Sequence, residues 1–549
     1  NILGLTITEG WRSATGNGAG ILQDSGSLAL NECAISDNFV GYGGGGGIYA
    51  SGAVLATKCI FSGNNAYFPG GGIAVAGTFR AVNCTVFGNT SAHNHGGGIA
   101  VNGNLFVTNC TISGNFAGAG ASGGGVFNDS GSATIRSTII AGNIASQGLD
   151  CYGMFTSAGF NLIGYINDSS GWGALGDQVR PANSFLDPLL GPLQYNGGPT
   201  KTRAPQAGSP AIDQGNSSGS STDQRGRTRP HANYSITSIP LGGDRSDIGA
   251  VELRPPLIYE WTFDHHDLSA ALGPGLLTYA DDATPGVTSF GTTDGATLPH
   301  IGGKPAAYMH VPAFTGLSNG YLVELTASDP NGGGQFINQY TFIADVLLPG
   351  SVNFMPFFNT NPQNQNDADF YIAPNGSVGI QVYSSPGLIT SNTWYRIAFV
   401  ADLALSRLIY FVNGLPVGTN NTPTLDGRWA LFSEDNPGAD LLLFNEGDLS
   451  GVYTHEVYVA HVAMIPRNLS ASEIAILGGP VAEGIFARRL SVNRSGNSVV
   501  LNWRGAANVA VQKATSFTLA NWQTIDATLG ASNYNETATS AAFYRLTGP

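Results

Sequence analysis

The chain has 549 residues, a formal net charge of −14 at pH 7 and only 11% charged residues. Soluble proteins usually carry about 25% charged residues, so Gly, Asn, Ser and Thr must form much of this surface. The negative net charge argues against nucleic acid or an anionic membrane as partner. The length predicts several domains. The sequence contains no apolar run of about 18 residues, so it predicts no transmembrane segment.

A six-residue motif recurs along the first part of the chain. Successive copies start 26, 25, 26 and 28 residues apart. The copies begin at Cys33, Cys59, Cys84, Cys110 and Thr138, and they end at Asn38, Asn64, Asn89, Asn115 and Asn143. A Gly-rich stretch before Ile or Val follows each of the first four copies in phase. A repeat of this length, without helix-length apolar stripes, predicts the coils of a right-handed parallel β-helix over residues 1–165.

The apolar positions within one repeat predict which side chains point inward. The fifth and third residues before the first Cys are Leu28 and Leu30, and the residue two beyond it is Ile35. The odd step from Leu30 to Cys33 changes the inward parity and predicts a corner there. A third inward run starts at Ile48. We therefore expect three strands and three corners per turn.

Two ladders of equivalent side chains follow from stacked turns. We interpret Cys33, Cys59, Cys84 and Cys110 as buried free thiols, since parallel side chains on adjacent strands suit a disulfide poorly. We expect the asparagines to hydrogen-bond along the axis at a corner. The first residues already read as a strand in mid-repeat, which predicts either a fragment of a longer chain or an open end that docks, for example head to tail in a fibre.

Residues 166–254 are rich in Pro and Gly. Their motifs at 187–193, 196–200, 208–213 and 247–252, together with Asn161-Leu162-Ile163-Gly164, resemble the carboxy-terminal part of bacterial secreted β-helix proteins of the choice-of-anchor type, related to polymorphic outer-membrane repeats. The resemblance implies a secreted or cell-surface protein whose solenoid is capped by this segment. It also contains Asp213, Asp223, Arg225, Arg227 and Asp247, which form either a catalytic or metal cluster or, as we prefer, salt bridges within the cap.

From residue 257 the pattern changes to longer alternating strands at 340–346, 394–400 and 408–414, the last of which runs into the turn signal Asn413-Gly414. With the motif at 426–429 they resemble the laminin-G-like, concanavalin-like jelly-roll domains of bacterial extracellular proteins, and we place this domain at 257–480. Such a domain implies binding of a glycan or a surface protein, often with calcium.

Two candidate sites fall in the predicted jelly roll, and each has a plain structural alternative. The glycan candidates, which alternatively form ordinary turns, are Asn361, Asn364, Asn366, Asp369, Tyr371 and Trp429. The calcium candidates, which alternatively form a solvated acidic loop, are Asp264, Glu434, Asp435, Asn445 and Asp448.

The last segment, 485–549, resembles the small fibronectin-like β-sandwich modules that end many secreted bacterial proteins. In the solenoid, His93 and His95 could bind a metal, but no third ligand is evident, which favours a solvated loop. We find no convergent set of ionisable residues, so the sequence predicts a non-enzymatic extracellular structural or adhesive protein. The alternative is a polysaccharide lyase or hydrolase, or its accessory chain, acting along the β-helix.

Overall fold

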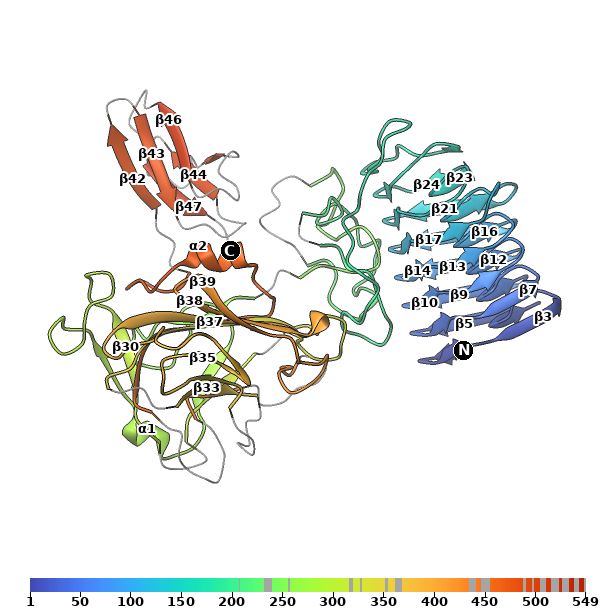
Figure 1. The fold of residues 1–549 in the computed structure, drawn as a ribbon. Coiled ribbons are helices and arrows are strands. Elements are labelled where there is room, and N and C mark those ends of the chain that lie inside the picture. Colours follow the sequence, from blue (N-terminus) through green and yellow to red (C-terminus); the bar gives the residue numbers. More distant parts are fainter. Residues whose placement is uncertain are drawn as a thin grey trace. The chain divides into compact units, whose positions relative to one another are not determined.

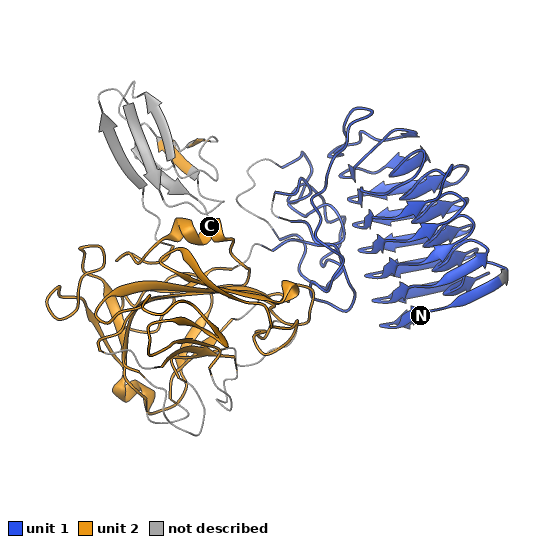
Figure 2. Cartoon of the chain, viewed as in Figure 1, with its two compact units in different colours: residues 1–255 blue, residues 256–549 orange. Residues whose placement is uncertain are grey.

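The computed structural model describes residues 1–206, 208–231, 239–254, 257–314, 319–325, 328–350, 354–360, 368–433, 441–445 and 455–486, and six strands beyond residue 489. The chain forms two compact units, residues 1–255 and 256–549 (Figure 2). Nearly all regular structure is β, with a parallel solenoid followed by antiparallel sheets, which confirms the predicted fold class. The finer division into four segments stays a prediction.

The first unit contains a solenoid of about six turns, in which equivalent strands stack in parallel along the axis (Figure 1). The first sheet contains β1 (Ile2–Leu3), β5 (Ser27–Asn31), β9 (Ala53–Thr57), β13 (Thr78–Val82), β17 (Asn104–Thr108), β21 (Ser132–Arg136) and β24 (Thr156–Ser157). The second contains β2 (Thr6–Thr8), β6 (Ala34–Ser36), β10 (Ile60–Ser62), β14 (Thr85–Phe87), β18 (Thr111–Ser113), β22 (Ile139–Ile140) and β25 (Leu162–Ile163).

The other two sheets complete each turn. The third sheet contains β3 (Trp11–Thr15), β7 (Phe39–Tyr42), β11 (Asn65–Ala66), β15 (Thr90–Ser91) and β19 (Phe116–Ala117). The fourth contains β4 (Ile21–Gln23), β8 (Ile48–Ala50), β12 (Ile73–Val75), β16 (Ile99–Val101), β20 (Val126–Asn128), β23 (Cys151–Met154) and β26 (Ser169–Ser170). A turn therefore has four strands, and the prediction of three was wrong. The third sheet has strands as short as two residues, too short to show an alternating apolar pattern.

Left-handed backbone makes the corners. The residue before each repeat Cys has positive φ, as at Lys58 (φ 55°) and Asn83 (φ 52°), which confirms the corner predicted from the parity change. The residue before each ladder asparagine does the same, as at Gly88 (φ 65°). The Gly runs make the third such corner: Gly70 has φ 78°, and a Cβ on the following Gly71 would lie 2.3 Å from the carbonyl carbon of Thr90. Glycine is required there by conformation and by space.

The solenoid interior is apolar, as predicted. The buried cluster includes the expected inward positions, among them Leu30, Cys33, Ile35 and Ile48, each at most 1% exposed. The segment after the last repeat covers one end of this core, because Ile166, Trp172 and Val179 pack against it.

The described residues between 186 and 254 instead lie along the outer face of the second sheet, and we call them the side cover. Ala250 donates its N–H to Thr111 Oγ1 (3.0 Å), and Thr85 Oγ1 donates to Gln224 Oε1 (2.7 Å). Further along, Thr200 Oγ1 donates to the carbonyl of Lys58 (3.2 Å). The segment predicted as an end cap thus covers one side of several turns, which the sequence did not predict.

The second unit contains a two-sheet sandwich. The described strands of the larger sheet are β29 (Ser289–Thr292), β30 (Ala307–Val311), β41 (Val457–Ile465), β32 (Gln339–Leu347), β37 (Trp394–Asp402), β38 (Arg407–Val412) and β39 (Leu415–Asn420), with β27 (Tyr259–Trp261) also paired to β41. The other sheet contains β28 (Leu276–Tyr279), β31 (Tyr321–Glu324), β40 (Leu441–Leu443), β33 (Met355–Asn359), β34 (Phe370–Ile372), β35 (Val378–Ile380) and β36 (Val382–Tyr383).

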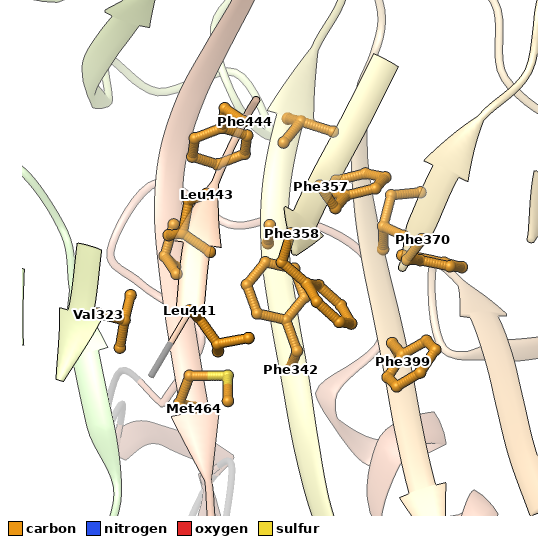
Figure 3. Packing of buried hydrophobic residues seen from close by; sticks show 14 of the residues in the cluster. Val323, Phe342, Phe357, Phe358, Phe370, Phe399, Leu441, Leu443, Phe444 and Met464 are labelled. Atoms are coloured by element: carbon orange, nitrogen blue, oxygen red, sulfur yellow. The ribbon is translucent and has the colours of Figure 1, made fainter. Parts of the chain in front are cut away.

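Aromatic side chains from both sheets fill the sandwich. Phe342 and Phe399 of the larger sheet meet Phe358 and Phe370 of the other, with ring centroids 5.0–5.1 Å apart for the pairs Phe342–Phe358, Phe358–Phe399 and Phe370–Phe399 (Figure 3). The three strands predicted from alternation are β32, β37 and β38, which are neighbours in one antiparallel sheet. The laminin-G-like assignment itself stays a prediction.

Short helices accompany the sandwich. They are α1 (Thr284–Val287), the 3-10 helix η1 (Leu403–Leu405) and α2 (Ala471–Leu477). The start of α2 is fixed by a capping box, in which Ser470 Oγ accepts the N–H of Glu473 (3.3 Å) and Glu473 Oε2 accepts the N–H of Ser470 (2.8 Å). Ile474 of α2 packs on the outer face of the larger sheet, against Ile343 and Ala398 among others.

The end of the chain contributes two small antiparallel sheets. One contains β42 (Leu490–Ser495), β43 (Ser498–Trp503) and β46 (Asn533–Thr537); the other contains β44 (Ala510–Ala514), β45 (Gln523–Ile525) and β47 (Phe543–Thr547). These sheets lie in the segment predicted as a small β-module, and its fibronectin-like assignment stays a prediction.

Candidate functional site

The repeat asparagines form a continuous hydrogen-bonded ladder inside the solenoid. Asn89 shows the pattern: its Oδ1 accepts the backbone N–H (3.0 Å) and the Nδ2 (2.9 Å) of Asn64, and its Nδ2 donates to Asn115 Oδ1 (2.9 Å) and to the Phe61 carbonyl (2.9 Å). Asn38 binds Asn64 in the same way. Since Asn89 is 0% exposed, the ladder holds successive turns together and is closed to a ligand.

The cysteines form a second ladder beside it. The Sγ atoms of Cys59, Cys84 and Cys110 each accept the backbone N–H of the Cys one turn before, at 3.3–3.4 Å. Thr138 takes the next place, and its Oγ1 accepts the N–H of Cys110 (3.2 Å). All five cysteines, including Cys151, are buried free thiols. Burial raises the pKa of the Cys84 thiol well above its usual value, so this side chain is not a reactive thiolate.

Both ladders end on residues that the sequence analysis missed. Asp150 Oδ1 accepts the backbone N–H and the Nδ2 of Asn143, both at 2.8 Å. Asn161 Oδ1 accepts the N–H of Thr138 (3.1 Å), and Asp177 Oδ1 accepts the N–H of Asn161 (2.9 Å). A carboxylate only accepts hydrogen bonds, so it can end a ladder without needing a further partner. The sequence feature that could have identified these residues is an Asn or Asp that follows the last repeat.

The strands of the solenoid carry no carboxylate. None of β1 to β26, all of which lie in the continuously described residues 1–206, contains Asp or Glu. Acid–base cleavage of a polysaccharide by the usual paired-carboxylate route requires two such groups within reach of one sugar. The side cover also lies over the outer face of the second sheet from Lys58 onward, whereas Thr6 and Thr8 of β2 stay exposed.

The ionic residues predicted near the cap lie in the side cover and bind one another. Asp223 Oδ2 lies 2.9 Å from Arg225 Nε, and Asp223 Oδ1 accepts the N–H of Arg227 (3.0 Å). Asp247 Oδ1 accepts the N–H of Asp213 (2.8 Å). Asp213, Asp223 and Asp247 are each 0% exposed, so a substrate cannot reach them, and the salt-bridge interpretation accounts for the cluster.

Burial and neighbouring charges set the protonation of this network. Burial opposes the ionisation of Asp223, but Arg225 and Arg229 outweigh it and hold its pKa below the usual value. Burial and the nearby Glu252 raise the pKa of Asp247 well above its usual value. Glu252 in turn pairs with Arg229 at 2.8 Å. This arrangement stabilises an irregular segment on the solenoid.

The solenoid histidines take part in stacking between turns. His95 Nδ1 accepts the N–H of Ser122 (3.0 Å), and its ring stacks on Phe127 with centroids 4.3 Å apart. His93 lies 4.4 Å from the ring of Tyr67. Among the described residues, no group of three or more His, Cys, Asp or Glu side chains is arranged to hold a metal ion.

The glycan candidates of the sandwich divide into two groups. Asn361, Asn364 and Asn366 lie outside the described residues. Tyr371 and Trp429 belong to the sandwich core and are each 5% exposed, so neither offers an open ring face to a sugar.

The third described candidate, Asp369, is 1% exposed and accepts hydrogen bonds from Thr360 and Arg428. Burial raises its pKa although Arg428 opposes this. The described part of the predicted glycan site is therefore a packed structural element, and the remainder stays a prediction.

The calcium candidates divide in the same way. Glu434, Asp435 and Asp448 lie outside the described residues. Asp264 Oδ2 accepts the hydroxyl of Thr262 (2.8 Å), whereas Asn445 donates from Nδ2 to the carbonyl of Asn319 (2.6 Å). These two residues bind separate partners, and calcium binding stays a prediction.

A buried ionic cluster that the sequence analysis missed lies on the outer face of the larger sheet. Arg396 binds Asp345 through two hydrogen bonds of 2.7 Å, and His461 Nδ1 lies 2.8 Å from Asp345 Oδ2. Burial opposes ionisation of Asp345, but Arg396 and His461 hold its pKa below the usual value. Arg396 also donates to the carbonyl of Leu477 (2.8 Å), which fixes the end of α2. No sequence motif joins these residues, which lie on three strands.

Comparisons with known proteins give matches among solved structures. No protein-family model and no curated protein matches the chain. Similar solved structures include domain 4 of an extracellular arabinanase from Geobacillus stearothermophilus, in complex with arabinotriose (17% identity, 40% of this chain and 98% of that chain, TM-score 0.27). A sialidase from Trypanosoma rangeli (16% identity, TM-score 0.23) is matched over 31% of this chain and 26% of its own.

A third similar structure is the binding domain of Paraclostridial mosquitocidal protein 1 (11% identity, TM-score 0.26), matched over 40% of this chain and 51% of its own. TM-scores of this size carry no argument about function. Separately, none of the described helices is long and apolar enough to cross a membrane.

Proposed function

We propose that the protein is an extracellular structural or adhesive protein of a bacterial surface, matrix or appendage, in which the solenoid is a rigid scaffold and the sandwich recognises glycans. The observation that carries the scaffold role is the asparagine ladder, whose buried amides link successive turns without a gap from Asn38 to Asn143. Fully satisfied buried polar networks fix one arrangement of the chain and make it rigid.

The absence of Asp and Glu from the solenoid strands β1 to β26 supports this role over polysaccharide cleavage along the solenoid. A lyase or hydrolase in this place would need carboxylates that converge on one exposed face. The extracellular location rests on the resemblance of the repeats and of residues 166–254 to secreted β-helix proteins. Head-to-tail assembly and calcium binding remain predictions of the same proposal.

A glycan array combined with product analysis tests the proposal. We expect the full chain to bind one or more neutral glycans and to release no new reducing ends or unsaturated products from them. Cleavage of a bound polysaccharide would refute the structural role. Failure to bind any glycan would remove recognition from the proposal and leave only the scaffold.

A further inference from the structure

A group of aromatic and polar side chains lies where β29, β30 and β41 meet. Met309 and Val311 of β30, and Val457 and Val459 of β41, belong to the sandwich core. Side chains alternate between the two faces of a strand, so the residues between them point away from the core. We call the following side chains the outer cluster: Ser289, Tyr308, His310 and Tyr458 on this face, and Glu456, which directly precedes β41 and contacts His310.

The five side chains hold one another in place. His310 lies opposite Ser289 on β29 and opposite Tyr458 on β41. Its Nε2 lies 2.7 Å from Glu456 Oε1, and its Nδ1 lies 3.3 Å from Ser289 Oγ. The ring of Tyr458 lies 4.7 Å from that of His310 and 5.2 Å from that of Tyr308, measured between centroids. Strands and mutual contacts therefore fix the cluster before any ligand arrives.

The outer cluster stays open to solvent while much of this sheet face is covered. Residues 469–485 pack over the middle of the face, and the loop containing Leu298 and Ile301 packs over another part. The side chain of His310 keeps 22% of its surface exposed and that of Glu456 keeps 44%. Gly291 leaves room for the phenol of Tyr308, since a Cβ there would lie 2.5 Å from the hydroxyl oxygen. Tyr308 and Tyr458 are half-buried, because they also pack against the apolar cluster that contains Leu298 and Ile301. Two half-buried tyrosine rings and a carboxylate thus border one small area of surface.

We propose that the outer cluster is a binding site for a neutral saccharide; the inference rests on the glycan recognition proposed above and gives it a place. Tyrosine offers a rigid ring for the apolar face of a sugar and a hydroxyl for its polar edge. The carboxylate of Glu456 accepts hydrogen bonds from sugar hydroxyls, and Ser289 both donates and accepts them. A few polar groups beside aromatic rings are typical of small-molecule sites.

Charge and geometry limit the alternatives. The outer cluster contains a carboxylate and no Lys or Arg, and the chain carries a net charge of −14, so an anionic saccharide is repelled. Ser289, His310 and Glu456 have the residue types of a nucleophilic triad. However, Ser289 lies exposed on the edge strand β29, where water reaches its hydroxyl. Recognition therefore fits the cluster better than catalysis.

Affinity electrophoresis of the full chain tests the site. The gels contain one neutral polysaccharide each, namely xylan, glucomannan, arabinan or hydroxyethyl cellulose, and polygalacturonate serves as the anionic comparison. The variants are Tyr458→Ala and Glu456→Gln. Matched controls on the other sheet are Tyr383→Ala, at a tyrosine that is 38% exposed, and Glu324→Gln, at an exposed glutamate. We expect each cluster variant to weaken binding by about tenfold or more and each control to leave it within about twofold. Thermal melting checks that every variant is folded, and Glu456→Gln keeps the test decisive if Tyr458→Ala does not fold.

The outcomes separate this inference from the proposed function. Loss of binding in the cluster variants alone supports both. If all variants still bind the polysaccharide, the outer cluster is not the binding site, although the protein still recognises glycans. Absence of binding by the natural chain overturns both. Hydrolysis of p-nitrophenyl acetate that Ser289→Ala abolishes would also overturn the inference, because it would assign the cluster to catalysis.

Discussion

Replacing Asn89 by alanine tests the asparagine ladder most directly. The change removes four hydrogen bonds of 2.9–3.0 Å, two accepted from Asn64 and one donated to each of Phe61 and Asn115. It leaves the N–H of Asn64 without its acceptor in a site that is 0% exposed. Asn115 keeps the bond that it accepts from the backbone N–H of residue 89, so the damage is confined to one step of the ladder.

The expected cost follows from these contacts. A buried donor left unpaired costs about 1–3 kcal/mol, and each of the other three bonds contributes about 0.5–1.5 kcal/mol net. Since the bonds share partners and do not add fully, we expect a loss of about 3–5 kcal/mol. Each 1.4 kcal/mol changes an equilibrium about tenfold, so amides protected by this part of the solenoid should exchange about two to four orders of magnitude faster.

Hydrogen exchange measured by mass spectrometry on the full chain reads this effect locally, which suits a protein with several units. The matched control is Asn104→Ala, at an exposed asparagine at the start of β17; surface substitutions of this kind change stability by about 0.5 kcal/mol or less. If peptides covering residues 85–116 exchange within about threefold of the natural chain in Asn89→Ala, the ladder does not stabilise the solenoid as argued.

Three further predictions concern the other buried polar groups. Cys110→Thr should lower the free energy of unfolding by less than about 1.5 kcal/mol, because Thr138 already accepts an N–H in the equivalent place. Cys110→Val should lower it by about 1–3 kcal/mol, because valine cannot accept the N–H of Cys84. Burial raises the pKa of Asp150 to about 7. The free energy of unfolding of the solenoid should therefore fall as the pH rises from about 4 to 7, by up to about 1.4 kcal/mol per pH unit. Asp150→Asn should remove this pH dependence. Arg396→Met should destabilise the sandwich by about 3–5 kcal/mol, because Asp345 stays buried without its guanidinium partner.

Each of these predictions has a clear contrary result. Equal melting temperatures for the threonine and valine variants of Cys110 would show that the N–H to sulfur contacts contribute nothing. A stability profile of Asp150→Asn with the same slope between pH 4 and 7 as the natural chain would assign the slope to another group. For Arg396, the double replacement Arg396→Met with Asp345→Leu should recover much of the stability, and no recovery would contradict the charge argument.

The solenoid was largely predictable because its information repeats. Five copies of one motif, read in phase, placed Cys33 and its equivalents inside, the corner before each of them, and the asparagines in a ladder. Stacked turns put equivalent residues about 4.8 Å apart, so a period in the sequence becomes a contact in space. The strand of the third sheet was not predicted because in three of its five turns it holds only two residues, too few to show alternation.

The sites of the sandwich were less predictable because chemical type does not determine burial. Tyr371 and Trp429 have suitable rings for a sugar, but they point into the core, and Asp369 pairs with Arg428 beneath the surface. The outer cluster joins residues far apart in the chain, Ser289, His310 and Glu456, through strand register alone. No spacing in the sequence marks such a group.

By itself, the sequence determined the coil of the solenoid, its inward positions and the three central strands of the sandwich, because periodic burial of apolar side chains leaves a periodic pattern. Only the tertiary structure decided where the side cover lies, which acids end the two ladders, and which side chains form the outer cluster. These outcomes depend on contacts between segments far apart in the chain, and such contacts obey no fixed spacing.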